Sequence, residues 1–342
     1  MNKEKTAILL MNVGSPDRPE VKSVYKYLTK FLNDKRVIDL PWLLRKFLVN
    51  GIIIPFRVKN STRLYQKLWT EKGSPLIFYS QEMKEKLQER LDDNMKVFVG
   101  MRYGNPGFKS AISNIKKGRF ERLVIFPLFP QFAMSTTETS VIAVKDELKR
   151  QNVNIKTTVV AQFYDNPLFI TAFVEQAKKY DLEKYDHIIF SYHGLPNRHI
   201  EKCHPGIKVQ DCQCYGTVPE HGTYCYRATC FATSLKIANA LGLKIENYSI
   251  SFQSRLSKNW LSPFTDELLL EKLKEGKKKI LVLAPSFVTD CLETIVEIGK
   301  DYAELFKENG GEKLQMVDSL NAEPQWIDAM FAIIEKSLNA AE

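Results

Sequence analysis

Long apolar runs are missing from this 342-residue sequence. Its longest apolar stretch, Leu40–Phe56, is interrupted by Arg45, Lys46, Asn50 and Gly51. A helix that crosses a bilayer needs about 20 consecutive, predominantly apolar residues. The first residues, MNKEKTAILLMNVGSP, also lack the apolar core and the small-residue cleavage site of a secretory signal peptide. We therefore expect a cytoplasmic protein without membrane spans.

Nucleotide-binding signatures are missing as well. No GxGxxG follows the first apolar run, and no GxxxxGK(S/T) occurs anywhere in the sequence. These signatures hold the phosphates of dinucleotides and of nucleoside triphosphates. The sequence also has no helix-turn-helix, zinc-finger repeat or RNP motif. We therefore expect neither a nucleotide cofactor nor a nucleic-acid partner.

The formal net charge is +9, from 49 Lys and Arg against 40 Asp and Glu. The basic residues are scattered among acidic ones, so a solvated basic surface is one explanation. Contact with an anionic membrane surface is another, because one segment places apolar side chains beside cations, as interfacial helices do. Its apolar side chains are Trp42, Leu43, Leu44, Phe47 and Leu48, and its cations are Arg45, Lys46 and Arg57. Peripheral membrane association is the resulting hypothesis.

Apolar, strand-like runs alternate with helical patterns along the whole sequence. Strands that are apolar on both faces and separated by helices indicate parallel sheets. The expected strands lie within 6–13, 96–104, 122–130, 155–163, 187–194, 248–254 and 279–287. This pattern predicts an α/β fold with two doubly wound, Rossmann-like domains. We place them at 1–160 and 161–320, and we expect a C-terminal helix at about 321–342, capped by Asn321, to pack on the first.

Candidate catalytic residues follow the expected strands, because ligands of such sheets bind beyond the carboxyl ends of the strands. His193 ends the apolar run IIFSYHG, and Gly194 and Pro196 turn the chain immediately after it. A buried structural histidine is the simpler explanation. However, a neutral imidazole at this rim can accept a proton or bind a metal, and the position favours such a role.

Four acidic residues follow the last expected strand. Asp290, Glu293, Glu297 and Asp301 are spaced i, i+3, i+7 and i+11, which predicts one face of a helix. A solvated acidic face is one explanation, and a path for protons or for a divalent cation is the other. The position of Glu293 at the start of the helix, beside a strand end, favours the path.

Aromatic and polar residues near other strand ends can flank a flat apolar ligand, although most of them pack equally well in an ordinary core. Arg102 differs from the rest. An arginine that follows an apolar strand needs an anionic partner, and a carboxylate of a ligand can serve.

Five of the six cysteines lie in one segment, Lys202–Cys230. Cytoplasmic disulfides are disfavoured, so the cluster indicates a metal site. The gaps between its consecutive cysteines are 8, 1, 10 and 4 residues. Structural zinc usually takes C-x2-4-C pairs, which match these gaps poorly, whereas four cysteines can also hold a [2Fe–2S] cluster. His204 and His221 in the same segment can compete as ligands, although an ordinary loop position is the simpler explanation for each.

Several motifs in this sequence resemble those of the ferrochelatase family. They are MRYGNP, PLFPQF with STT, SYHGLP, SFQSR with WLSPFTDE, and DCLETIVEI, in this order, and the resemblance runs from ILLMNVGSPD to LNAEPQWIDAM. It implies two Rossmann-like domains and the insertion of Fe²⁺ into protoporphyrin IX, the last step of haem synthesis, with release of two protons. The alternatives are a coproporphyrin III ferrochelatase and a related cobalt or nickel chelatase.

The resemblance also implies roles for single residues. His193 resembles the catalytic histidine and Glu293 its acidic partner, while Glu297 and Asp290 resemble residues of the metal path. Val13 stands where members that use coproporphyrin tend to have tyrosine, so the resemblance favours protoporphyrin. The positions that resemble substrate-binding residues are Val13, Tyr65, Ser74, Arg102, Tyr103, Trp260 and Phe287.

Certain bacterial members of the family carry a [2Fe–2S] cluster on cysteines of a segment inserted at this place. The resemblance therefore implies such a cluster here as cofactor. We expect Cys203, Cys212, Cys214 and Cys225 to be its ligands, with Cys230 as the alternative, because members without a cluster can also have a cysteine at that last position. Protoporphyrin IX and ferrous iron are the expected partners.

Overall fold

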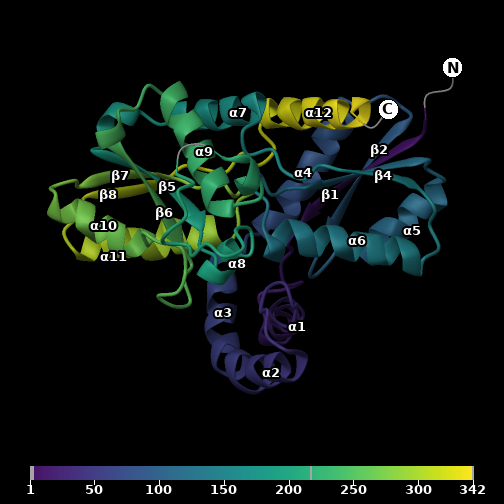
Figure 1. Ribbon diagram of the computed structural model, residues 1–342, viewed down its shortest axis with the longest axis horizontal. Helices are drawn as coiled ribbons and strands as arrows, with labels where there is room; N and C mark the ends of the chain where they lie inside the picture. Colours follow the sequence, from purple (N-terminus) through teal and green to yellow (C-terminus); the bar gives the residue numbers. More distant parts are fainter. Residues whose placement is uncertain (1–3, 216–217, 341–342) are drawn as a thin grey trace. The chain divides into compact units, whose positions relative to one another are not determined.

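Two four-stranded parallel sheets form the framework of the computed structural model, which describes residues 4–215 and 218–340 (Figure 1). One compact unit comprises residues 1–129, 133–162 and the chain from Met330 onward, and the other comprises 130–132 and 163–329. Each sheet lies within one unit. The prediction of an α/β fold with parallel sheets is confirmed.

The sheet of the first unit has the strand order β2-β1-β3-β4, with every neighbouring pair parallel. All residues of β1 and β3 are buried, because helices cover both faces of a parallel sheet. The strands are β1 (Thr6–Asn12), β2 (Met95–Met101), β3 (Arg122–Pro127) and β4 (Lys156–Val159).

The helices of the first unit pack their apolar sides on this sheet. Phe108, Ile112 and Ile115 of α5, with Val144 and Leu148 of α6, join one face of β1 and β3 in a single buried cluster. The helical segments are α1 (Val21–Leu32), α2 (Trp42–Phe47), η1 (Leu48–Ile53), α3 (Ile54–Leu68), α4 (Pro75–Gln88), α5 (Phe108–Gly118), η2 (Met134–Glu138) and α6 (Thr139–Arg150).

The sheet of the second unit has the order β6-β5-β7-β8 and is also parallel. Its strands are β5 (His187–His193), β6 (Tyr248–Gln253), β7 (Lys279–Leu283) and β8 (Lys313–Met316). All seven expected strands of the chain are present, and each ends before its apolar run does. The sequence did not predict β8, because this short edge strand is only partly buried and has no apolar run.

Helices cover both faces of the second sheet. Leu268 and Leu269 of α10, Ile298 of η6 and Phe306 of α11 belong to the buried cluster on one face. The helical segments are α7 (Pro167–Lys178), η3 (Leu182–Lys184), α8 (Asn197–Glu201), η4 (Glu220–Gly222), α9 (Tyr226–Ala240), η5 (Ile245–Asn247), α10 (Thr265–Lys274), η6 (Leu292–Tyr302) and α11 (Ala303–Glu308).

The C-terminal helix α12 (Pro324–Asn339) begins later than the sequence predicts. Asn321 does not cap it. The backbone of Asn321 adopts φ 45°, and the side chain of Asn321 donates a hydrogen bond to Asp290 instead. The residues of α12 up to Ala329 belong to the second unit, and those from Met330 onward belong to the first.

The apolar segment from α2 to α3 exposes large side chains in the described part of the chain. Leu43 is 72% exposed, Phe47 69% and Phe56 84%, and Trp42 and Leu44 are also exposed. Arg45 is buried and its guanidinium donates to the carbonyl oxygens of Ile38 and Leu40. Within residues 4–215 and 218–340, no helix is both long enough and apolar enough to cross a membrane.

The strand order determines where ligands can bind. The chain continues from β1 to β2 on one side and later to β3 on the other, and β5 is flanked by β6 and β7 in the same way. At such a switch point the connections beyond the carboxyl ends of adjacent strands diverge and leave a crevice. Val13 follows β1 and His193 ends β5, so both lie at these points.

Gly14 shapes the first of these points. It has φ +103°, and a Cβ atom added there would lie 1.8 Å from the carbonyl oxygen of Tyr103. Gly73 also has a positive φ, +95°, but an added Cβ would meet nothing within 4 Å. The two glycines thus share the backbone conformation and differ in the space around it.

We predict that Gly14→Ala lowers the free energy of unfolding by more than about 3 kcal/mol, because backbone strain and a steric clash add. Gly73→Ala should lower it by only about 1–2 kcal/mol, the cost of the left-handed conformation alone. Urea unfolding followed by circular dichroism measures both values. Equal losses in the two variants would contradict the role of the close approach to Tyr103.

Candidate active site and metal centre

His193 is the last residue of β5, at the carboxyl edge of the second sheet. Its Nδ1 lies 2.7 Å from the carbonyl oxygen of Gly194. Because a carbonyl oxygen can only accept, Nδ1 carries the hydrogen in this contact, and the Nε2 lone pair of a neutral ring stays available. The hydroxyl of Tyr226 donates to the carbonyl oxygen of His193 at 3.0 Å and helps to fix the backbone. This arrangement prepares Nε2 to accept a proton or bind a metal.

Two aromatic rings flank this imidazole. The ring centroids of Trp260 and Phe287 each lie 6.4 Å from that of His193. Both side chains are half-buried, so part of each ring stays accessible. Phe287 follows β7, and Trp260 forms an isolated β-bridge with Pro196, close after β5. The structure therefore brings three of the predicted site residues together.

Asp290 anchors the start of the π-helix η6. Its carboxylate accepts hydrogen bonds from Asn321 Nδ2 at 2.7 Å, Thr294 Oγ1 at 3.0 Å and the Ser319 amide at 3.2 Å. Its own amide donates to Asn321 Oδ1 at 2.9 Å. The carboxylate is buried by these contacts. The sequence missed this anchor because Ser319 and Asn321 lie about thirty residues further along the chain.

Three of the four acidic residues predicted to share a helical face lie on the helix, and Asp290 does not. Asp290 precedes η6, which begins after Cys291. The helix is of the π type, whose i→i+5 hydrogen bonds change which residues lie above one another. Glu293, Glu297 and Asp301 are all on η6, whereas the carboxylate of Asp290 accepts the hydrogen bonds described above.

Glu297 is held by two hydroxyl groups. Ser254 Oγ donates to its Oε2 at 2.5 Å, and the Tyr302 hydroxyl donates to its Oε1 at 2.9 Å. Burial raises the pKa of Glu297, while the Ser254 hydrogen bond and the charge of His193 lower it and the charge of Glu293 raises it. The net pKa is above the ordinary value. The charges of His193 and Glu293 therefore both act on the carboxylate of Glu297.

Ser254 reaches Glu297 from the turn after β6. Its φ of 63° is in the left-handed region, which non-glycine residues rarely adopt. Gln253, which pairs with His193 in the sheet, donates from Nε2 to the carbonyl oxygen of Glu293 at 3.3 Å. The end of β6 thus contacts η6 twice.

The first unit contains a second polar group around Asp34. Its carboxylate accepts hydrogen bonds from Arg102, the Tyr103 hydroxyl and Thr139 Oγ1. Burial raises the pKa of Asp34, but these partners and the Arg36 amide lower it, and the net pKa is below its usual range. Burial also raises the pKa of Tyr103. The anionic partner that the sequence predicts for Arg102 is thus present in the chain itself.

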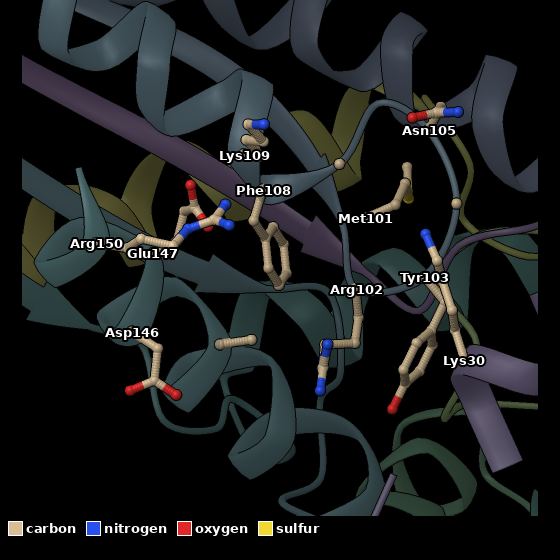
Figure 2. Close-up of a pocket in the computed structure, with 13 residues that line it drawn as sticks. Lys30, Met101, Arg102, Tyr103, Asn105, Phe108, Lys109, Asp146, Glu147 and Arg150 are labelled. Atoms are coloured by element: carbon tan, nitrogen blue, oxygen red, sulfur yellow. The ribbon is translucent and has the colours of Figure 1, made fainter. Parts of the chain in front are cut away.

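A pocket of about 640 Å³ opens beside Arg102 and Tyr103, beyond the end of β2 (Figure 2). Most of its polar lining is charged: Lys30, Arg102, Lys109, Asp146, Glu147 and Arg150. Charged walls suit anionic or hydrated groups and are unsuited to the apolar face of a flat ligand. Arg102 lies 4.7 Å from the ring centroid of Tyr103, so the two side chains form one edge of the pocket.

The sequence predicts three more substrate contacts in the first unit, namely Val13, Tyr65 and Ser74. The Tyr103 amide donates to the carbonyl oxygen of Val13 at 2.9 Å, which joins the ends of β1 and β2. Tyr65 is buried on α3 and packs edge-on against Tyr27 at 6.0 Å. Ser74 is buried at the N-cap position of α4. Val13 and Tyr103 are therefore in direct contact, and the ring of Tyr27 packs edge-on against both Tyr65 and Tyr103.

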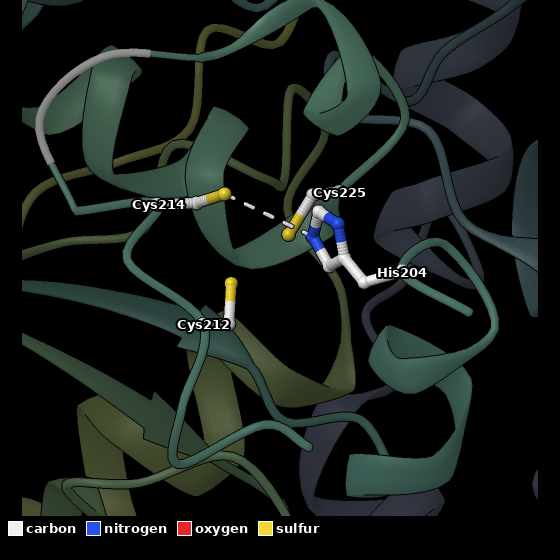
Figure 3. Close-up of side chains that lie close together, drawn as sticks. All are labelled: His204, Cys212, Cys214 and Cys225. Carbon is white, nitrogen blue, oxygen red and sulfur yellow. Dashed lines mark hydrogen bonds between the residues drawn. The ribbon is translucent and has the colours of Figure 1, made fainter. Parts of the chain in front are cut away.

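The cysteine-rich segment gathers four donor side chains (Figure 3). The ligand atoms of His204, Cys212, Cys214 and Cys225 all lie within 4.8 Å of one another, and all four residues are buried. Cys214 Sγ lies 3.8 Å from His204 Nε2. Thiols and an imidazole are donors that both zinc and iron–sulfur clusters accept, so this group fits a metal centre. His221, the other competing ligand, has a side chain outside the described part of the structure.

Burial and a nearby cation set the acidities of these thiols. Burial raises the pKa of Cys214 to about 11 and that of Cys225 to about 12. For Cys212 the backbone and thiol of Cys214 and the charge of Arg227 outweigh burial, and its pKa is lowered. A bound metal favours the thiolate over the thiol and deprotonates such ligands outright.

Cys203 and Cys230 are placed differently. The half-buried Cys203 thiol donates to the carbonyl oxygen of Tyr224 at 3.3 Å and approaches that of His199 at 3.9 Å. Cys230 is fully buried on α9, and burial raises the pKa of its thiol well above the ordinary value. Neither residue belongs to the group of four mutual neighbours.

Comparisons with known proteins give the family. The family model described as Ferrochelatase matches residues 5–338. The ferrochelatase of Coxiella burnetii (strain Dugway 5J108-111) is 40% identical over 342 residues, covering 98% of this chain and 95% of the relative. The ferrochelatase of Legionella pneumophila (strain Corby) is 40% identical over 335 residues, covering 98% of this chain and 100% of the relative.

Solved structures agree on the fold. SirB from Bacillus subtilis with Fe³⁺ superposes with a TM-score of 0.55, covering 98% of this chain and 97% of that chain at 11% identity. The sirohydrochlorin chelatase SirB from Bacillus subtilis subspecies spizizenii, in complex with cobalt, gives 0.54 at 10% identity and covers 98% and 96%. At these identities the likeness concerns the fold alone. The family model and the two relatives lead to one conclusion: this chain belongs to the ferrochelatase family.

Proposed function

We propose that this protein inserts Fe²⁺ into protoporphyrin IX, forms protohaem and releases two protons. The observation that carries the proposal is the position of His193. Its Nε2 is available at the carboxyl end of β5, between Trp260 and Phe287, and the charge that the ring acquires on protonation would favour the carboxylate of Glu297. A base, an apolar aromatic wall and a chain of carboxylates are what metal insertion into a macrocycle needs.

The base removes the protons. Two pyrrole N–H protons must leave while four nitrogen lone pairs bind the metal, so the net reaction exchanges two protons for one Fe²⁺. Nε2 of His193 accepts a proton from a pyrrole nitrogen, because Nδ1 already donates to the Gly194 carbonyl. The imidazolium formed is stabilised by the negative charge of Glu297.

The carboxylates of η6 carry protons and iron. Glu293 and Glu297 supply oxygen ligands, which suit hard or borderline divalent cations. The raised pKa of Glu297 brings its two protonation states closer in free energy, as proton transfer requires. The anchor at Asp290 fixes the start of η6 and therefore the position of Glu293, which is three residues further on.

Residues of the first unit support the proposed substrate. Val13 presents a small apolar side chain where a tyrosine would add a hydroxyl, which favours the less polar protoporphyrin over coproporphyrin. Arg102 holds Asp34 and Thr139 with part of its guanidinium, and its other N–H groups can donate to a propionate. Tyr65, Ser74 and Tyr103 are the remaining proposed contacts of the substrate.

A [2Fe–2S] cluster is the cofactor that we propose for the cysteine-rich segment. The buried thiols of Cys212, Cys214 and Cys225 support it, because such clusters are held by cysteine thiolates. The cluster would supply a redox-active centre. Metal insertion itself involves no change of oxidation state, so the proposed chemistry at His193 does not require it.

The α2–α3 segment is the proposed contact with a membrane. Its exposed apolar side chains stand next to Lys46 and Arg57, the combination by which interfacial helices bind anionic lipid. Such a contact would give the protein direct access to an apolar substrate that partitions into membranes. The protein would then be cytoplasmic and bind the membrane only peripherally.

We predict that His193→Ala lowers kcat at least about 100-fold in anaerobic Fe²⁺ insertion into protoporphyrin IX, followed by absorbance, because general-base catalysis is lost. Glu293→Gln should cause a loss of similar size. His187→Gln, at the opposite end of the same strand, is the matched control and should retain activity. Full activity of His193→Ala would rule out the proposed mechanism, and a faster reaction with coproporphyrin III or with Co²⁺ or Ni²⁺ would rule out the proposed substrates.

A second prediction concerns pH. Ser254→Ala and Tyr302→Phe each remove a hydrogen bond that favours the Glu297 carboxylate, so its raised pKa should rise further. Since the carboxylate is the working form, activity is present above this pKa and lost as the pH falls through it. The acidic limb of the kcat/KM profile should therefore move to higher pH, by about one pH unit. Glu304→Gln, which changes an exposed acid just after η6, is the control and should leave the pH profile unchanged. An unshifted acidic limb in both Ser254→Ala and Tyr302→Phe would contradict the role of Glu297.

A third prediction tests the membrane contact. Leu43→Ser should lower the affinity for phosphatidylglycerol–phosphatidylcholine vesicles about tenfold in a cosedimentation assay. The reason is that one apolar side chain is no longer transferred from water into the membrane. Ile245→Ser is the matched control, since Leu43 and Ile245 are both 72% exposed. Equal effects of the two substitutions, or no binding by the parent protein, would show that this segment is not a membrane contact.

A further inference from the structure

The four mutually close donors of the cysteine-rich segment include a histidine in the place of a fourth cysteine. His204, Cys212 and Cys214 are 3–4% exposed, and Cys225 is fully buried. Their ligand atoms lie within 4.8 Å of one another, and Figure 3 shows the imidazole pointing toward the thiols of Cys214 and Cys225. A single metal centre can contact all four.

The turn after α8 explains why His204 and not Cys203 is in this group. The amides of Cys203 and His204 donate to the carbonyl oxygens of Ile200 and Glu201, so the chain continues the helical path for one more turn. Adjacent residues on such a path point in different directions. The imidazole of His204 is therefore directed at the thiols, while the thiol of Cys203 is directed at the Tyr224 carbonyl oxygen.

We propose that His204 is the fourth ligand of the metal centre, with Cys212, Cys214 and Cys225, and that Cys203 is not a ligand. The inference refines the [2Fe–2S] cluster proposed above and rests on it. Clusters with histidine in place of cysteine are chemically sound, as the two histidines of Rieske centres illustrate. Nε2 is the ring atom that approaches the thiols, so it is the proposed ligand atom.

The buried positive charge near the centre is compatible with three thiolate ligands. Arg227 is 5% exposed, and its guanidinium donates to the carbonyl oxygen of Cys212 and lies 4.5 Å from the Tyr215 ring centroid. Within the described residues no carboxylate forms an ion pair with it, so the thiolates provide the nearby negative charge. A neutral imidazole gives one negative charge fewer than a fourth thiolate, and lower negative charge raises the reduction potential of a cluster.

The first test needs no substitution. Anaerobically purified protein is analysed for iron, acid-labile sulfide and zinc, and then reduced with dithionite and examined by pulsed EPR. Hyperfine coupling of the reduced cluster to a directly bound nitrogen is expected. A cluster with iron and sulfide in equal amounts but without this nitrogen coupling would refute the histidine ligand and leave the proposed cluster intact.

Neighbouring variants provide the second test. Cys203→Ser should keep the iron, the sulfide and the visible spectrum, whereas His204→Ala should lose them. His204→Cys restores four thiolates, so it should regain the cluster without nitrogen coupling and with a lower reduction potential. Loss of the cluster in Cys203→Ser together with its retention in His204→Ala would overturn the assignment.

The same preparations separate this inference from the proposals it rests on. Zinc without sulfide in the parent protein would refute the [2Fe–2S] cluster, and zinc content in the Cys203→Ser and His204→Ala variants would then test the ligand set by itself. Iron insertion into protoporphyrin is measured in parallel. Its absence in a parent protein that shows the nitrogen coupling would refute the proposed reaction and support the ligand assignment.

Discussion

The candidate active site depends on the hydrogen bonds that hold the carboxylates of η6 against the ends of β5 and β6. Asp290 fixes the first turn of η6 through Thr294, Ser319 and Asn321, and Ser254 and Tyr302 hold Glu297 further along. A π-helix is less regular than an α-helix and often occurs at functional sites. Without these side-chain contacts, the acidic groups would have no fixed position relative to His193.

Buried charge is compensated locally at each polar site. Asp34 is surrounded by donors from Arg102, Tyr103 and Thr139, and the buried Arg227 lies next to the thiols of the cysteine-rich segment. Uncompensated burial of an ion costs several kcal/mol, so such partners are required. Glu297 is compensated less completely, its pKa remains raised, and this makes it suited to proton transfer.

The cysteine-rich segment has little regular structure of its own. Between α8 and α9 the described residues contain a single short helical turn, η4. A segment of this kind gains stability when a metal binds its side chains, because metal binding couples to folding. The buried donors His204, Cys212, Cys214 and Cys225 form its centre, so the metal proposed for them would hold the segment together.

The sequence by itself determined the parallel α/β fold, because strands buried on both faces leave a strong apolar signal. It also determined the position of His193 at the end of a strand. It missed β8, which is short and partly exposed, and the hydrogen bonds of Asp34 and Ser254, whose partners lie far away in the chain. It also missed the hydrogen bond of Tyr302, although its partner Glu297 is only five residues away. It predicted Cys203 as a ligand and left His204 as a competitor, and the structure groups His204 with Cys212, Cys214 and Cys225. Only the tertiary structure decided these points, since spacing along a chain does not tell in which direction a turn sends each of two neighbouring side chains.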